Sequence, residues 1–166
     1  MKLQIFLSSK MQRNVLQPER IVARKAIEAI EIWTCWHWEE HATSGSFPPM
    51  DLCLDEVKRS DALVLILGRD LTENTRQEYE MAASLPIRRY VFVKSGNLQP
   101  HTRQFLKDIQ SEVTYQKFAN VGELETMIKK SLQDDLVRGY RALRGYPAIG
   151  LPGAMPPVAS YPKKAV

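Results

Sequence analysis

The chain has 166 residues, of which 44% are apolar and 25% charged, and its formal net charge is +4. These values predict one soluble globular domain with a substantial core. No stretch approaches membrane-spanning length, and no block of Lys and Arg marks a nucleic-acid module, so we expect neither a membrane nor a nucleic-acid partner. Two cysteines, Cys35 and Cys53, are too few for a disulfide framework and favour a reducing, cytoplasmic compartment.

Strand and helix patterns alternate along most of the chain. In chain order, we expect a strand over 3–7, a helix from Pro18 through Ile32, a strand over 32–38, a turn-rich loop over 41–49, a helix over 50–59, a strand over 62–67, a helix to about Leu85, a strand over 89–93, a short helix from Pro100, a strand over 113–118 and a long helix after Asn120. Asn120 and Glu123 have capping-box spacing, and Leu124, Ile128 and Leu132 would hold one face of the last helix.

The run 62–67 is continuously apolar, which is typical of a strand buried on both faces in a parallel sheet. Five strands alternating with five helices predict right-handed crossovers and a doubly wound α/β domain. We expect a single flavodoxin-like, three-layer domain over residues 1–143, with a mostly parallel sheet in the order 2-1-3-4-5. The Pro/Gly-rich sequence over 144–166 cannot continue a helix, and we expect a flexible, disordered tail there rather than a ligand for a proline-binding groove.

Glu78 follows the central strand, at the edge where open α/β sheets bind their ligands. Two roles are open for it. Thr75 and Glu78 have the spacing of a capping box, in which Glu78 folds back onto the backbone amide of Thr75. In the other role the carboxylate points into a pocket. The two exclude each other, because a Glu bonded to its own N-cap is not aimed at a ligand.

Four segments together resemble a known family. They are Ile5–Ser9, Cys53–Asp61, Leu65–Gly68 and the helix start Thr75-x-x-Glu78-Tyr79-Glu80-x-Ala82. In this order they resemble the TIR-like domains of unknown function fused to bacterial STAND NTPases, which in turn resemble nucleoside 2-deoxyribosyltransferases and related nucleotide N-glycosidases. The transferases have a glycine-containing turn before their glutamate. Here Glu73-Asn74 stands at that point, and its side chains obstruct a close backbone approach.

The resemblance implies an enzyme that cleaves or transfers at the N-glycosidic bond of NAD or a related nucleoside or nucleotide, taken as substrate and not held as a cofactor. Glu78 is then the catalytic carboxylate, which stabilises or attacks the positive charge at the anomeric carbon. The expected substrate-binding residues lie at strand ends and at the helix start: Ser8, Ser9, Trp36, Trp38, Glu39, Gly68, Arg69 and Thr75.

Each of these residues also has a purely structural role open to it. Ser8 and Ser9 would hold a phosphate or a ribose hydroxyl, or form an ordinary polar turn. Arg69 would pair with a phosphate, or remain a solvated loop residue. Trp36 and Trp38 share one face and would stack on the base, or pack under a helix.

A leaving purine or pyrimidine needs a proton donor, whereas nicotinamide leaves NAD as a neutral molecule without one. Asp61, Asp70 and Tyr79 are the local candidates for a donor, although Asp61 stands at the amino end of the central strand, opposite the expected ligand crevice. His37 and His41 flank a strand end and the cysteines lack ligand spacing, so no metal site is expected.

A non-catalytic signalling or assembly module is the second hypothesis, because TIR-like domains serve both roles. Under either hypothesis the ligand is a nucleotide or nucleoside. We also expect a homo-oligomer and allow for a partner protein.

Overall fold

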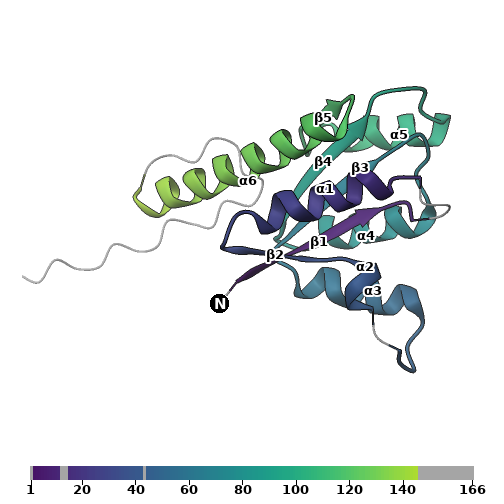
Figure 1. The fold of residues 1–166 in the computed structure, drawn as a ribbon, viewed down its shortest axis with the longest axis horizontal. Helices are drawn as coiled ribbons and strands as arrows, with labels where there is room; N and C mark the ends of the chain where they lie inside the picture. Colours follow the sequence, from purple (N-terminus) through teal and green to yellow (C-terminus); the bar gives the residue numbers. More distant parts are fainter. Residues whose placement is uncertain (1, 12–14, 43, 146–166) are drawn as a thin grey trace, which may run out of the picture.

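The computed structural model describes residues 2–11, 15–42 and 44–145 (Figure 1). Its elements in chain order are β1 (Leu3–Ser9), α1 (Gln17–Glu28), β2 (Trp33–Trp36), α2 (Trp38–His41), α3 (Pro49–Arg59), β3 (Ala62–Leu67), α4 (Glu73–Ala83), β4 (Arg88–Lys94), α5 (Pro100–Ile109), β5 (Tyr115–Phe118) and α6 (Val121–Leu143). Most of the tail predicted over 144–166 lies outside the described residues.

The strands form one parallel sheet of five, in the order β2-β1-β3-β4-β5. This arrangement confirms the predicted flavodoxin-like topology. β1 and β3 pair at the centre of the sheet, with Ser8 opposite Leu65 and Ser9 opposite Ile66. The polar end of β1 therefore lies beside the apolar end of β3, at the carboxyl edge of the sheet.

Helices cover both faces of the sheet and create two cores (Figure 1). The first core joins alternate β3 residues such as Val64 and Ile66 to α1 and α6, where Leu124, Ile128 and Leu132 are fully buried as expected. The second core joins the other β3 residues, such as Leu65, to α3, α4 and α5. Because side chains alternate along a strand, neighbouring residues of β1 face different helices.

Local signals placed several boundaries correctly. β3 has the predicted bounds, and Asn120 is the N-cap of α6, where its side chain accepts a hydrogen bond from the Glu123 amide at 3.0 Å. Other boundaries differ from the prediction. β2 ends at Trp36 and a short helix, α2, takes the place of the predicted strand end, while α1 stops at Glu28 instead of reaching Ile32.

Among the described residues, no helix has both the length and the apolar character that a membrane span requires.

Candidate functional site

Two serines at the carboxyl end of β1 bring the site together. Ser8 and Ser9 are 1% and 6% exposed, so neither belongs to an open polar turn. The alternation of the strand directs Ser8 toward α4 and Ser9 toward α1. Ser8 donates a hydrogen bond to Glu78, and Ser9 accepts one from Arg20. The two polar contacts lie on opposite faces of one strand end.

Glu78 does not close the capping box that its spacing suggests. α4 begins at Glu73, and its N-cap is Thr72, whose side chain accepts from the amide of Thr75 at 3.3 Å. That earlier start places Glu78 beyond the first turn of the helix. Its side chain points into the protein, where its Oε2 accepts from the Ser8 hydroxyl at 2.5 Å. The capping-box interpretation is therefore wrong: Glu78 points inward onto Ser8, and it is not among the residues that line the pocket beyond β3.

Burial changes the chemistry of the Glu78 carboxyl group. Only 9% of the residue is exposed, and this burial raises its pKa from the ordinary 4.5 to about 7. The Ser8 hydroxyl and the positive charge of Arg20 oppose the shift without cancelling it. A carboxyl group of this kind is partly ionised near neutral pH and can change its charge state during a reaction.

Cys53 on α3 lies close enough to Glu78 to respond to its charge. Burial, followed by the negative charge of Glu78, raises the pKa of the Cys53 thiol to about 12. The thiol is therefore a neutral neighbour of the carboxylate and not a nucleophile. The sequence offered no local signal for this contact, because Cys53 and Glu78 belong to different helices.

Thr75 lies near the site but serves the helix start. It is 2% exposed, and its hydroxyl contacts the Thr72 hydroxyl at 2.8 Å. The predicted N-cap role belongs to Thr72, three residues earlier. Thr75 is held in place as a buried helical residue one turn before Glu78.

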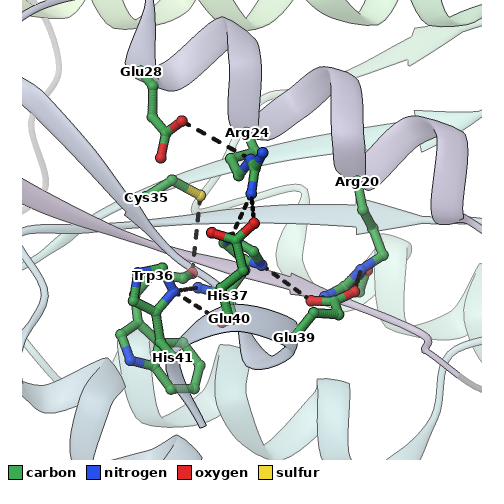
Figure 2. A network of polar contacts seen from close by, with 10 residues as sticks. Arg20, Arg24, Glu28, Cys35, Trp36, His37, Glu39, Glu40 and His41 are labelled. Atoms are coloured by element: carbon green, nitrogen blue, oxygen red, sulfur yellow. Dashed lines mark hydrogen bonds and ion pairs between the residues drawn. The ribbon is translucent and has the colours of Figure 1, made fainter.

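Arg20 links the end of β1, through Ser9, to α2, through Glu39; Figure 2 shows its contact with Glu39. Arg20 is 5% exposed. Its guanidinium group donates a hydrogen bond to Ser9 and one to each carboxylate oxygen of Glu39. Burial alone would raise the Glu39 pKa, but hydrogen bonds from Arg20 and His37 and the Arg20 charge lower it to about 2. Glu39 is thus a permanent anion that holds Arg20.

A second arginine completes this contact between α1 and α2. Arg24 bonds Glu40 and approaches the His37 ring, which also contacts Glu39 at 3.2 Å (Figure 2). The His37 and His41 rings meet edge to face at 4.9 Å. In the described part of the chain, no group of three or more His, Cys, Asp or Glu residues is placed to hold a metal ion.

The two candidate tryptophans both pack on the α3 and α4 side of the sheet, although Trp38 lies in α2 and not on the strand from which their shared face was predicted. Trp36 is 6% exposed and stacks on Phe6 with ring centroids 4.8 Å apart. Its ring already has an aromatic partner, which corresponds to the structural alternative of packing under a helix. Trp38 begins α2 and packs partly buried against the same core.

Gly68 and Arg69 line a pocket of about 430 Å³ beyond the end of β3. A side chain at Gly68 would bring its Cβ to within 3.2 Å of Leu16, so the glycine allows close packing at that wall. Arg69 is exposed, which leaves its guanidinium group accessible from this pocket.

None of the three candidate proton donors contacts Glu78. Asp61 lies at the opposite edge of the sheet, where it accepts from the Gln4 amide at 2.8 Å. Asp70 pairs with Lys10 and His101, and the Lys10 hydrogen bond holds the Asp70 pKa below its usual range. Tyr79 packs edge to face on Phe105, and burial raises the pKa of its hydroxyl.

The site therefore consists of a buried carboxyl group of raised pKa, oriented by a serine, with a basic pocket farther along the same edge. A carboxylate of this kind can stabilise or attack a developing cation. The three residues predicted as proton donors for a leaving base, Asp61, Asp70 and Tyr79, have their hydrogen-bond partners elsewhere.

Comparisons with known proteins place the chain by family and by fold. Residues 4–133 match the family described as Domain of unknown function (DUF4062). No curated protein matches the chain. A conserved protein from Enterococcus faecalis V583 is 14% identical and has a TM-score of 0.51, with 79% of this chain and 99% of that chain covered. This similarity supports the flavodoxin-like fold alone.

The metal-soaked Flv1 flavodiiron core from Synechocystis sp. PCC6803 is more distant. It is 11% identical with a TM-score of 0.48, and the alignment covers 81% of this chain but 36% of that one. Its chemistry has no bearing on the present site.

Proposed function

The chain belongs to the DUF4062 family, and we propose that it cleaves or transfers at the N-glycosidic bond of a nucleotide, with Glu78 as the catalytic carboxylate. One observation carries the proposal. Glu78 is aimed inward at the carboxyl edge of the sheet, against Ser8, where burial raises its pKa to about 7. The resemblance to TIR-like domains and nucleoside deoxyribosyltransferases supports the same reaction class.

In this mechanism the sugar lies with its anomeric carbon over the Glu78 carboxylate. As the bond to the base breaks, the base takes the bonding electrons and the sugar becomes positively charged. Glu78 either stabilises that charge or forms a bond to the anomeric carbon, and water or a second base then completes the reaction. Ser8 positions the carboxylate through its hydrogen bond and does not react itself.

The surroundings of Glu78 favour a base that leaves without protonation. Among the described residues, Asp61, Asp70 and Tyr79 all have partners away from Glu78. Nicotinamide needs no general acid, because it leaves a cationic pyridinium as a neutral molecule. NAD is therefore the first substrate to test, as a substrate and not as a resident cofactor.

The experiment is a chromatographic assay for released base. Wild-type protein and Glu78→Gln are incubated with NAD and with a panel of nucleosides and nucleotides, at high protein concentration to favour self-association. Glu80→Gln is the matched control, because Glu80 lies on the exposed side of the same helix and pairs with Arg76. Release by wild type and Glu80→Gln but not by Glu78→Gln supports the proposal, and release by Glu78→Gln contradicts it.

The second candidate function is a non-catalytic module that binds a nucleotide or a partner protein. The observation that favours it is the low exposure of Glu78, at 9%, with one carboxylate oxygen already occupied by Ser8. In that case Glu78 fixes α4 to β1, and no compound in the panel loses its base. A homo-oligomer, a partner protein and a cytoplasmic location remain predictions under both functions.

A further inference from the structure

The basic pocket lies where the order of the sheet reverses. β1 has β2 on one side and β3 on the other, and the pocket opens beyond the ends of β1 and β3. In open α/β sheets this is the crevice that receives ligands. The volume of about 430 Å³ is in the range of small-molecule sites.

Positive charge predominates in the polar lining of the pocket. Lys10 follows β1, Arg69 follows β3 and His101 lies in the first turn of α5, whereas Asp70 is the one carboxylate among the residues that line it. Lys10 and His101 each contact Asp70 at 2.6 Å. Asp70 therefore holds the side chains of Lys10 and His101 at one wall of the pocket. Its single negative charge does not neutralise the positive charge of both Lys10 and Arg69.

Arg69 supplies the charge that Asp70 does not balance. Within the described part of the chain, it makes no ion pair with a carboxylate. When the Gln99 side-chain amide is assigned the orientation that satisfies its polar atoms, its oxygen accepts hydrogen bonds from Arg69 Nε and Nη2, each at 3.1 Å. This neutral contact positions the guanidinium group and leaves its charge for a ligand. The amino end of α5, which no side chain caps, adds partial positive charge to the same wall.

We infer that this pocket binds the phosphate group of the substrate, so that Lys10 and Arg69 select nucleotides over nucleosides. A phosphate or diphosphate group matches a wall of Lys, Arg and His donors because it carries negative charge and several acceptor oxygens. This inference rests on the proposed function only in treating the bound phosphate as part of a reacting substrate. The binding of phosphate is argued from the residues of the pocket alone.

The course of β1 connects this pocket to Glu78. Ser8, Ser9 and Lys10 are consecutive, and Ser8 bonds Glu78 while Lys10 lines the pocket. A nucleotide held by its phosphate at Lys10 would extend its sugar along the same sheet edge toward Glu78. Phosphate binding would then position the sugar for the reaction at the anomeric carbon.

The test measures binding by isothermal titration calorimetry for three probes: AMP, ribose 5-phosphate and adenosine. Wild type should bind the two phosphate-bearing probes at least about tenfold more tightly than adenosine. Arg69→Gln alone, and with Lys10→Gln, should remove that preference. The control Arg76→Gln with Lys130→Gln removes two positive charges from exposed helix surfaces outside the pocket lining, and it should retain the preference.

Equal affinity for AMP and adenosine, no saturable binding of either phosphate-bearing probe, or unchanged preference in the pocket variants would overturn the inference. These outcomes are separable from failure of the proposed function. If binding depends on the phosphate but no base is released, the pocket assignment holds and the proposed enzymatic function is wrong. If base is released at the same rate from nucleosides and nucleotides, the proposed function holds and the pocket assignment is wrong. Glu78→Gln should still bind AMP, since it does not line the pocket.

Discussion

The raised pKa of Glu78 makes the stability of the folded domain depend on pH. The carboxyl group titrates at about 7 when folded, against an ordinary value of 4.5. The folded chain holds this proton more tightly than the unfolded chain does. Its contribution to stability is therefore complete below pH 4.5 and is lost as the pH rises through about 7.

The magnitude follows from the two pKa values. At about 1.4 kcal/mol per pH unit, a shift of this size corresponds to about 3 kcal/mol of unfolding free energy. Glu78→Gln carries no titrating proton at this position. The unfolding free energy of wild type, minus that of Glu78→Gln, should therefore decrease by about 3 kcal/mol between about pH 4 and about pH 8.

Urea unfolding followed by tryptophan fluorescence measures this difference, since Trp33 and Trp36 are 4% and 6% exposed and report on the core. All other ionisable groups are common to both proteins, so their contributions largely cancel in the difference. Glu80→Gln, which removes an exposed carboxylate paired with Arg76, should change stability by no more than about 1 kcal/mol at any pH. A wild-type minus Glu78→Gln difference that stays constant with pH would refute the burial of an ionisable Glu78.

Three further predictions concern the helix caps, the core and the thiols. Asn120→Ala removes the acceptor for the backbone amide of Glu123 and should lower the unfolding free energy by about 1 kcal/mol in urea melts. Asn120→Asp keeps an acceptor and should not lower it, so equal losses in the two variants would contradict the cap. Ile128→Ala empties a fully buried position and should cost about 3 kcal/mol in the same assay, with a loss below about 1 kcal/mol speaking against the α6 packing. Cys35 and Cys53 are 1% and 9% exposed, and burial raises the pKa of both thiols. They should react with a thiol reagent only in denaturant, and rapid labelling of the folded protein would contradict their burial.

Features set by local chemistry could be predicted from the sequence. The continuous apolar run gave the bounds of β3 because both faces of that strand are covered, and Asn120 marks α6 because an N-cap depends on neighbouring residues. The alternation of strands and helices predicts a doubly wound sheet, and the order 2-1-3-4-5, expected as the usual one for a flavodoxin-like chain of this size, is the order that the structure has. These predictions needed no knowledge of distant contacts.

The site depended on contacts that a local pattern does not contain. Thr72 and Thr75 are both acceptable N-caps, and the choice between them decides whether Glu78 faces its own helix or Ser8, which is 70 positions away. Trp36 ends a strand like an exposed aromatic, yet Phe6 on the neighbouring strand gives it a partner. The sequence carries no signal for Arg20, because only the fold brings Ser9 and Glu39 beside this helical arginine and buries it.

The pH dependence of base release tests the central claim most directly. With NAD as the substrate, release by wild type should rise with pH to a plateau above about 7, as Glu78 becomes ionised, and Glu78→Gln should show no release at any pH. Turnover by Glu78→Gln, or a wild-type rate that does not change across this range, would contradict the assignment of Glu78 as the catalytic carboxylate.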